Sequence, residues 1–189
     1  LAWETDQTKK VAPLLDKLPF DVKDLLARKT KGFAFSPDQN KILYTASASA
    51  QLKEGLITKI PGSSTQKEAR NIEGGMSYVY DVKEDKNFLV FASDASVGYL
   101  VPHFATGVKL SDLLALKSPR IYWFPSSNHI ELAEDSKVSI GDYDGTNSIV
   151  IWSGVYSAPF ALPMPSDSRL LILTSLGGTS SNLYALGLR

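Results

Sequence analysis

The sequence predicts an all-β fold, a β-propeller whose blades are sheets of four antiparallel strands. Three observations predict it: a hairpin pattern that occurs three times, a third strand of similar type after each hairpin, and a spacing close to one blade length. Self-similarity at intervals of roughly 40–50 residues is typical of propellers. Because each blade buries its faces against its neighbours, the repeat also predicts where the core lies.

Each recurring hairpin consists of an apolar run, a proline, a small polar turn and a second apolar run. Proline fixes φ at the first corner of a tight turn, and Asp, Ser and Asn side chains stabilise the turn through hydrogen bonds to the backbone. Aromatic and branched residues on either side favour strands. The three copies span residues 33–44, 122–132 and 161–173.

Further strands are predicted after each hairpin, because four antiparallel strands make one blade. Third strands are expected at residues 78–82, 138–143 and 183–188, and residues 1–6 look like a fourth copy. Fourth strands are expected at residues 11–15, 87–92 and 148–152.

The spacing of the hairpins indicates where insertions lie. Pro125 and Pro165 are 40 residues apart, which is one blade length, whereas Pro37 and Pro125 are 88 apart. The longer interval fits two blades or one blade with large insertions. The tetrapeptide Asp-Leu-Leu-Ala occurs at 24–27 and again at 112–115. The two copies are 88 residues apart, the same interval as that between Pro37 and Pro125, which favours one blade with insertions. Both stretches are candidates for short helices.

We therefore interpret the chain as a single propeller unit. Its segments are the end of a preceding blade at 1–18, a blade at 31–92 with a long loop at 47–75, a helical connection at 93–118, a blade at 119–153, and a blade lacking its last strand at 158–189. Propellers close with four or more blades, so the chain is expected to be the C-terminal part of a larger propeller. The alternative is a compact four-bladed ring in which the N-terminal strands complete the last sheet.

Composition excludes several classes of function. Twenty basic residues balance twenty acidic ones, so the chain has no net positive charge that would favour the binding of nucleic acid. The chain has no cysteine, which excludes thiol nucleophiles, disulfides and thiolate metal sites. No run approaches the roughly 20 apolar residues that span a bilayer. Membrane contact is therefore expected only through an anchor upstream of this chain.

The polar motifs predict no catalytic, cofactor or metal site. Asp142, Asp144 and Asn147 supply three oxygen ligands, whereas calcium takes about six to eight. His129 and Glu131 would point the same way along a strand, but no candidate nucleophile lies beside them. The chain also lacks the G-x-S-x-G motif of serine hydrolases.

The long loop at 47–75 is the main candidate for partner binding. Loops beyond roughly 12–15 residues tend to be functional or disordered. Its apolar residues alternate with charged ones, which fits either an amphipathic docking segment or a mobile surface excursion. Two residues of the 93–118 connection are further contact candidates. The predicted partner-binding residues are Leu52, Leu56, Ile57, Ile60, His103 and Phe104.

Two motifs carry a family resemblance. Residues 35–42, Phe-Ser-Pro-Asp-Gln-Asn-Lys-Ile, resemble the F-S-P-D-G-x-x-I hairpin of TolB-like and WD-repeat-like propellers, and residues 142–145 resemble the D-x-D-G turn of TolB-like blades. The whole run is similar to the C-terminal propellers of bacterial PEGA-domain envelope proteins. This resemblance implies an extracytoplasmic location in the cell envelope and a protein partner.

The function expected from the sequence is a non-enzymatic protein-interaction or scaffolding propeller that needs no cofactor. The alternative is a carbohydrate-binding or hydrolytic propeller with a site in its central channel, where Asp81, Glu131 and Asp142 could converge. A purely structural ring that spaces other domains is a third possibility. A fold alone does not decide among them.

Overall fold

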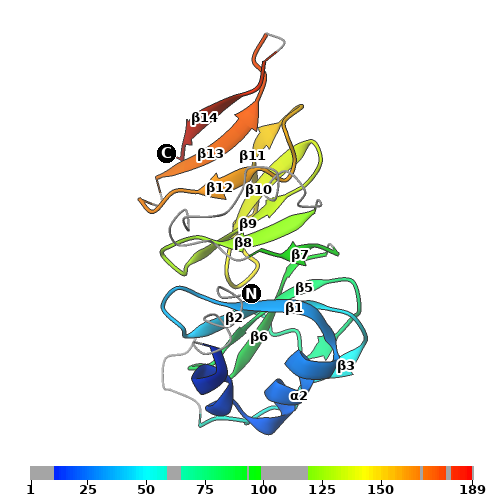
Figure 1. The fold of residues 1–189 in the computed structure, drawn as a ribbon. Helices are drawn as coiled ribbons and strands as arrows, with labels where there is room; N and C mark the ends of the chain where they lie inside the picture. The colour runs from blue at the N-terminus through cyan, green and yellow to red at the C-terminus, as the bar shows by residue number, and fades with distance from the viewer. Residues whose placement is uncertain are drawn as a thin grey trace.

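The chain is an all-β protein in which three sheets follow one another along the molecule (Figure 1). The computed structural model describes residues 11–58, 65–92, 94–98, 119–166, 168–177 and 180–188. The three sheets correspond to the three predicted hairpins and their downstream strands. We call them sheet 1, sheet 2 and sheet 3 in chain order.

Sheet 1 is antiparallel throughout, with the strand order β1-β2-β5-β6. Its strands confirm those predicted at 33–44, 78–82 and 87–92. Between β2 and β5 the chain leaves the sheet, and β3 pairs with β4 at the base of the long loop. The strands are β1 (Thr30–Phe35), β2 (Lys41–Ala46), β3 (Ala50–Gln51), β4 (Asn71–Ile72), β5 (Ser77–Asp81) and β6 (Lys86–Phe91).

Sheet 2 has five strands in the order β11-β10-β9-β8-β7. Four of them confirm the predicted hairpin, third strand and fourth strand. The short β7 pairs parallel to β8 and lies within the connection predicted to be helical. The strands are β7 (Ser96–Val97), β8 (Arg120–Trp123), β9 (His129–Ala133), β10 (Lys137–Asp142) and β11 (Ile149–Ser153).

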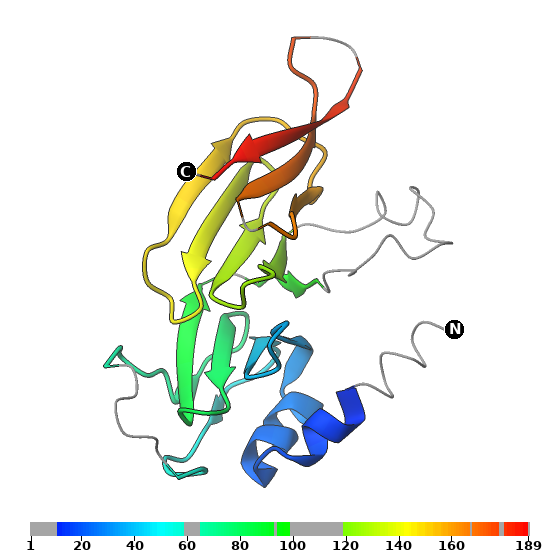
Figure 2. The ribbon, with the colours of Figure 1, turned by 90° about the vertical axis from the view of Figure 1, so that its left-hand side faces the viewer.

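Sheet 3 has three antiparallel strands in the order β12-β13-β14. They confirm the predicted third hairpin and its following strand. The strands are β12 (Ala161–Pro163), β13 (Arg169–Thr174) and β14 (Asn182–Gly187). In each sheet the hairpin strand that comes first in the chain lies on one side of the molecule, and β6, β11 and β14 lie on the other (Figure 2).

The hairpin turns of sheets 1 and 2 have the same hydrogen bonding. The N–H of Ser36 donates to the Lys41 carbonyl at 2.8 Å, and the N–H of Phe124 donates to the His129 carbonyl at 2.9 Å. The left-handed residue also recurs, as Gln39 with φ 62° and Ser127 with φ 63°. The repeat seen in the sequence is therefore a repeat of backbone geometry.

An apolar cluster lies between sheets 1 and 2. Leu43, Val79 and Phe88 of sheet 1 are fully buried there. Ile121 and Trp123 of β8 pack against them from sheet 2. The three residues of sheet 1 are direct cross-strand neighbours, and the two residues of β8 are at alternate positions, as expected for side chains on one face of a pleated sheet.

A second apolar cluster lies between sheets 2 and 3. Ala133 and Val138 of sheet 2 pack against Ala161, Leu170 and Ile172 of sheet 3, and all five are fully buried. The β9 strand therefore serves both clusters. Its even-numbered residues face sheet 1, and Ala133 faces sheet 3.

The outer face of sheet 1 is covered by helices, which corrects the prediction for residues 11–15. Residues 11–16 are helical rather than extended, and α2 follows at Phe20–Arg28. Leu18 is buried against sheet 1 beside Val22, Leu25 and Leu26 of α2. The physical reason is helical spacing, since Val11, Leu14, Leu15 and Leu18 recur at intervals of three and four residues. The strand predicted at residues 1–6 lies outside the described residues.

Candidate functional site

The long loop packs on sheet 1, which corrects the role predicted for Leu52. Its side chain is 3 % exposed within the core cluster of sheet 1 and α2, so it stabilises the loop instead of facing a partner. Leu56 packs against the same cluster and is half-buried, as is Ile57. The other predicted contact residues, Ile60, His103 and Phe104, lie outside the described residues.

A buried ion pair anchors this loop. Arg70 donates from Nη1 to Asp85 Oδ1 at 3.2 Å and from Nε to Glu68 at 2.6 Å. Asp85 is fully buried and also accepts hydrogen bonds from the Tyr80 hydroxyl and the Leu56 N–H, each at 2.8 Å. The loop is therefore tied to the β5–β6 turn by charged groups whose hydrogen bonds are satisfied.

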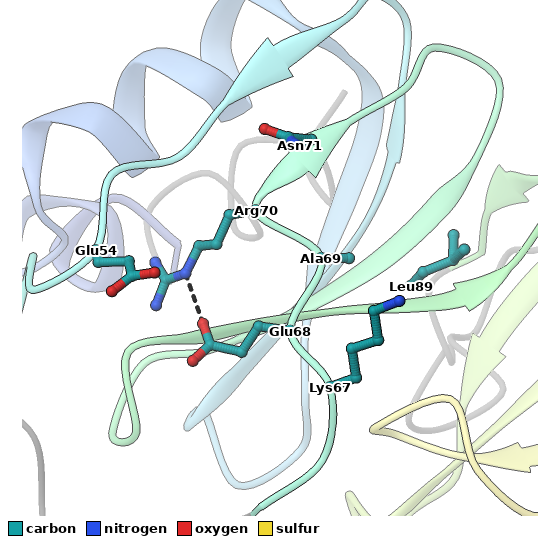
Figure 3. A pocket seen from close by; sticks show the side chains of 7 residues that line it. All are labelled: Glu54, Lys67, Glu68, Ala69, Arg70, Asn71 and Leu89. Carbon is teal, nitrogen blue, oxygen red and sulfur yellow. Dashed lines mark hydrogen bonds and ion pairs between the residues drawn. The ribbon is translucent and has the colours of Figure 1, made fainter.

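A polar groove lies between the returning end of this loop and β6. Arg70 and Glu68 pair on one side of it, whereas Lys67 extends towards Leu89 on the other (Figure 3). The groove has a volume of about 570 Å³ and is open to solvent. Its lining residues are Glu54, Lys67, Glu68, Ala69, Arg70, Asn71 and Leu89.

Leu89 belongs to a wider set of exposed apolar residues on the outermost strands. Leu89 of β6 is 40 % exposed, Ile149 and Val150 of β11 are 61 % and 56 % exposed, and Leu183 of β14 is 52 % exposed. All three strands lie on the same side of the molecule (Figure 2). We call these four residues the outer-strand surface.

The outer-strand surface carries little charge on its strands. Strands β11 and β14 contain no charged residue, and β6 contains only Lys86. Edge strands usually carry charges or proline that discourage pairing with other chains. An uncharged edge with large exposed apolar side chains is instead typical of a surface that binds another protein.

Sequence reasoning placed these strands but missed the exposure of their apolar residues. The run Ile149-Val150-Ile151-Trp152 is apolar at every position instead of alternating, and it gave no signal of this exposure. Such a run predicts a strand covered on both faces. In the structure Ile151 and Trp152 pack against sheet 3, whereas Ile149 and Val150 stay exposed.

The three carboxylates considered for a channel site have separate surroundings. Asp81 accepts hydrogen bonds from the N–H groups of Lys83 and Glu84, each at 2.9 Å, and burial raises its pKa. Asp142 accepts a hydrogen bond from Asn147 at 2.6 Å, so both carboxylates stabilise turns. Glu131 lies on β9 and is fully buried inside the molecule.

His129 pairs with Asp142 instead of Glu131. The His129 Nδ1 lies 2.8 Å from Asp142 Oδ1, and the imidazole is half exposed. Within the described residues no group of three or more His, Asp or Glu side chains is placed to hold a metal ion. The described helices are also too short or too polar to cross a membrane.

Comparisons with known proteins add little. No protein-family model matches the chain, and no curated protein matches it. Among solved structures, the chain is similar to hydrazine synthase of Kuenenia stuttgartiensis with 12 % sequence identity and a TM-score of 0.37. The match covers 90 % of this chain and 47 % of that one, so the chain spans about half the length of the structure it matches.

Proposed function

We propose that this chain is a protein-interaction module made of β-propeller blades, which binds its partner along the outer-strand surface. The observation that carries the proposal is that the outermost described strand of each sheet has at least one large exposed apolar residue, namely Leu89, Ile149 and Val150, and Leu183. Four large exposed apolar side chains on one side of a molecule favour a macromolecular contact over scattered solvent exposure.

The arrangement of the sheets supports the propeller part of the proposal. Consecutive sheets stack face to face, with their first strands next to one another. Trp123 of β8 donates from Nε1 to the Ala34 carbonyl of β1 at 3.1 Å. An arrangement with the first strands on one side of the stack and the last described strands on the other fits radial blades. Within this proposal the chain is a TolB-like module of the bacterial cell envelope.

The module is proposed to act without catalysis or a cofactor. Asp81 and Asp142, two of the three carboxylates available for a channel site, hold turns in place. In the groove beside Arg70, the Arg70 guanidinium already pairs with Glu68 of the lining and with Asp85. These observations give less support to the carbohydrate-binding or hydrolytic alternative than the outer-strand surface gives to protein binding.

Site-specific photo-crosslinking in the source organism tests the proposal. A photoreactive amino acid replaces Val150 or Leu183 in the full-length protein, and Phe20 on α2, which is 77 % exposed, serves as the matched control. We expect one discrete protein adduct from positions 150 and 183 that is absent from position 20. Identical adducts from all three positions, or none from the outer strands, would contradict the proposal.

A pair of substitutions then tests whether the contact is apolar. Val150→Asp and Leu183→Asp should each abolish co-purification of the crosslinked partner, because a charge at the contact must be desolvated. Phe20→Asp is expected to leave co-purification unchanged. Retention of the partner by both outer-strand variants would show that the contact lies elsewhere.

A further inference from the structure

Glu131 has a fully buried carboxyl group with no hydrogen-bond partner among the residues that the structure describes. It lies in the middle of β9, is 0 % exposed, and neither side-chain oxygen has a partner. On this strand Ile130 and Leu132 face sheet 1, whereas Glu131 and Ala133 are turned the other way, towards sheet 3. The carboxyl group therefore lies between sheets 2 and 3.

The groups that face Glu131 from sheet 2 provide no compensating ion pair. Tyr122 is directly opposite on β8, and its hydroxyl makes no hydrogen bond of normal geometry. Arg120 sits over the Tyr122 ring, with its central carbon 5.9 Å from the ring centroid. Burial raises the pKa of Tyr122 to about 12, although Arg120 opposes the shift, so the phenol is neutral. On β10 the residue opposite Glu131 is Ile140.

The groups packed from the sheet 3 side are almost entirely apolar. Strands β12 and β13 contribute Ala161, Leu170 and Ile172, all fully buried. The half-buried Tyr184 of β14 packs at the margin of this cluster. Tyr156, in the link before β12, donates its hydroxyl to the Glu134 carbonyl, and its pKa is raised by burial first and then by the charge of Glu131.

These surroundings favour the neutral form of the Glu131 carboxyl. Burial raises its pKa well above the ordinary value of 4.5, and no charged partner acts in the opposite direction. A neutral carboxyl can be buried at moderate cost, whereas a carboxylate without a partner in an apolar interface is far less stable.

We propose that Glu131 is a proton-dependent latch between sheets 2 and 3. Sheet 3 packs on sheet 2 while the Glu131 carboxyl carries its proton, and the packing loosens when the proton leaves. This inference goes beyond the proposed function, because it concerns how sheets 2 and 3 hold together and not the binding of a partner.

Sheet 3 is the part expected to loosen. Side-chain hydrogen bonds join sheets 1 and 2, from Trp123 to Ala34 and from Asp38 to Ser127. The contact between sheets 2 and 3 rests mainly on the apolar cluster around Leu170 and Ile172. Segments held by few such contacts open at lower free energy than the rest of a protein.

The direction of the pH effect follows from linkage. The folded state binds a proton at Glu131 that the unfolded state releases above pH 4.5, so stability is complete below that value and falls as pH rises. Between pH 4.5 and the raised pKa, the opening equilibrium constant for sheet 3 should increase by up to about tenfold per pH unit from this group.

Carbon-13 NMR of glutamate side chains in the wild-type protein tests the latch directly. We expect one carboxyl resonance to titrate well above 4.5 and to be missing in Glu131→Gln. Titration of every glutamate near its ordinary value would overturn the proposal. This measurement needs only the wild-type chain, so it remains decisive even if a variant folds poorly.

Hydrogen exchange then reports where the structure opens. After correction for the intrinsic pH dependence of exchange, β13 amides of the wild type should lose protection as pH rises, up to about tenfold per unit. Glu131→Gln keeps the shape of the side chain but removes its titratable carboxyl group. In this variant the protection of the β13 amides should not vary with pH. Amides of β2 in sheet 1 serve as the internal control. Equal pH dependence of β13 in the wild type and Glu131→Gln would overturn the latch.

Discussion

The backbone N–H of Asp38 donates a hydrogen bond to the side-chain hydroxyl of Ser127 at 3.0 Å. The two residues belong to the hairpin turns of sheets 1 and 2, which share the same backbone conformation. Turns that repeat in the sequence therefore touch in space. Hydrogen bonds between equivalent turns fix how one sheet stacks on the next, and several expectations depend on that stacking.

Trp123→Phe is expected to destabilise the chain by about 1–3 kcal/mol. The substitution removes the indole donor to the Ala34 carbonyl, so a buried hydrogen bond between sheets 1 and 2 is lost together with part of the packing of a large side chain. Trp152→Phe is the matched control, because Trp152 is half-buried and donates to the nearby Gly154 carbonyl. Urea unfolding should show the larger loss for Trp123→Phe. Equal losses would mean that the hydrogen bond between the sheets adds nothing.

Gly145→Ala is expected to be more destabilising than Gly177→Ala. Both glycines have a positive φ, 83° and 73°, where an alanine costs roughly 1–2 kcal/mol. At Gly145 a Cβ atom would also overlap the Leu89 carbonyl oxygen of sheet 1, whereas at Gly177 nothing lies within 4 Å. The difference between their unfolding free energies therefore measures how closely the turn after β10 fits against β6. A difference near zero would show that this contact can yield.

Much of the fold could be predicted from the sequence because the repeat is local. Each hairpin contains the residues that form its turn, such as Pro37-Asp38 and Pro125-Ser126. The strands beside each turn are rich in branched and aromatic residues. The helix at 11–16 was missed because the apolar residues that follow the strand predicted at 1–6 were interpreted as the fourth strand of a blade. The spacing of its apolar residues at intervals of three and four was the signal that distinguishes a helix from a strand.

The functional surface could be predicted less well, because exposure depends on which elements cover a strand. Leu52 looked like a loop residue free to bind, yet β3–β4 pairing brings it into the core. Ile149 and Val150 lie within the strand predicted at 148–152, yet no described element covers them. The burial of Glu131 was equally hidden, since sheet 3 that covers it is distant in the chain.

Asp38→Asn is expected to weaken the chain above pH 4 and to reduce its loss of stability in acid. Burial tends to raise the pKa of Asp38, but hydrogen bonds from Ser36 and Asn40 outweigh it and lower the pKa to about 2. The stabilising contribution is therefore present above the ordinary value of 3.8 and is lost as pH falls towards 2.

The measurement is the unfolding free energy between pH 2 and pH 6 in wild type, Asp38→Asn and Ser36→Ala. Ser36→Ala removes one of the hydrogen bonds and should show an intermediate pH dependence. The pH dependence of the double variant should resemble that of Asp38→Asn, because the Ser36 hydroxyl affects this titration through its hydrogen bond to Asp38. Its stability at pH 6 should be lower than that of Asp38→Asn, because the Ser36 hydroxyl also accepts a hydrogen bond from the Lys41 N–H. An acid profile of Asp38→Asn that parallels the wild type would contradict this assignment.

Arg70→Ala is expected to release the long loop and to cost about 3–5 kcal/mol. Asp85 would remain buried with its charge uncompensated. Removing one partner of a buried ion pair lowers the free energy of unfolding more than removing both partners does. The loop should then become sensitive to proteases, because Arg70 also donates to the Lys53 carbonyl and so holds both ends of the loop together.

Two further variants separate charge from packing. Lys53→Ala removes an exposed ion pair with Asp21, worth about 0–1 kcal/mol, and should leave the loop resistant to proteases. Arg70→Ala combined with Asp85→Asn removes the stranded charge and should recover part of the stability lost by Arg70→Ala alone. If the combined variant is no more stable than Arg70→Ala, then the arginine acts through its packing, and the ion pair does not anchor the loop.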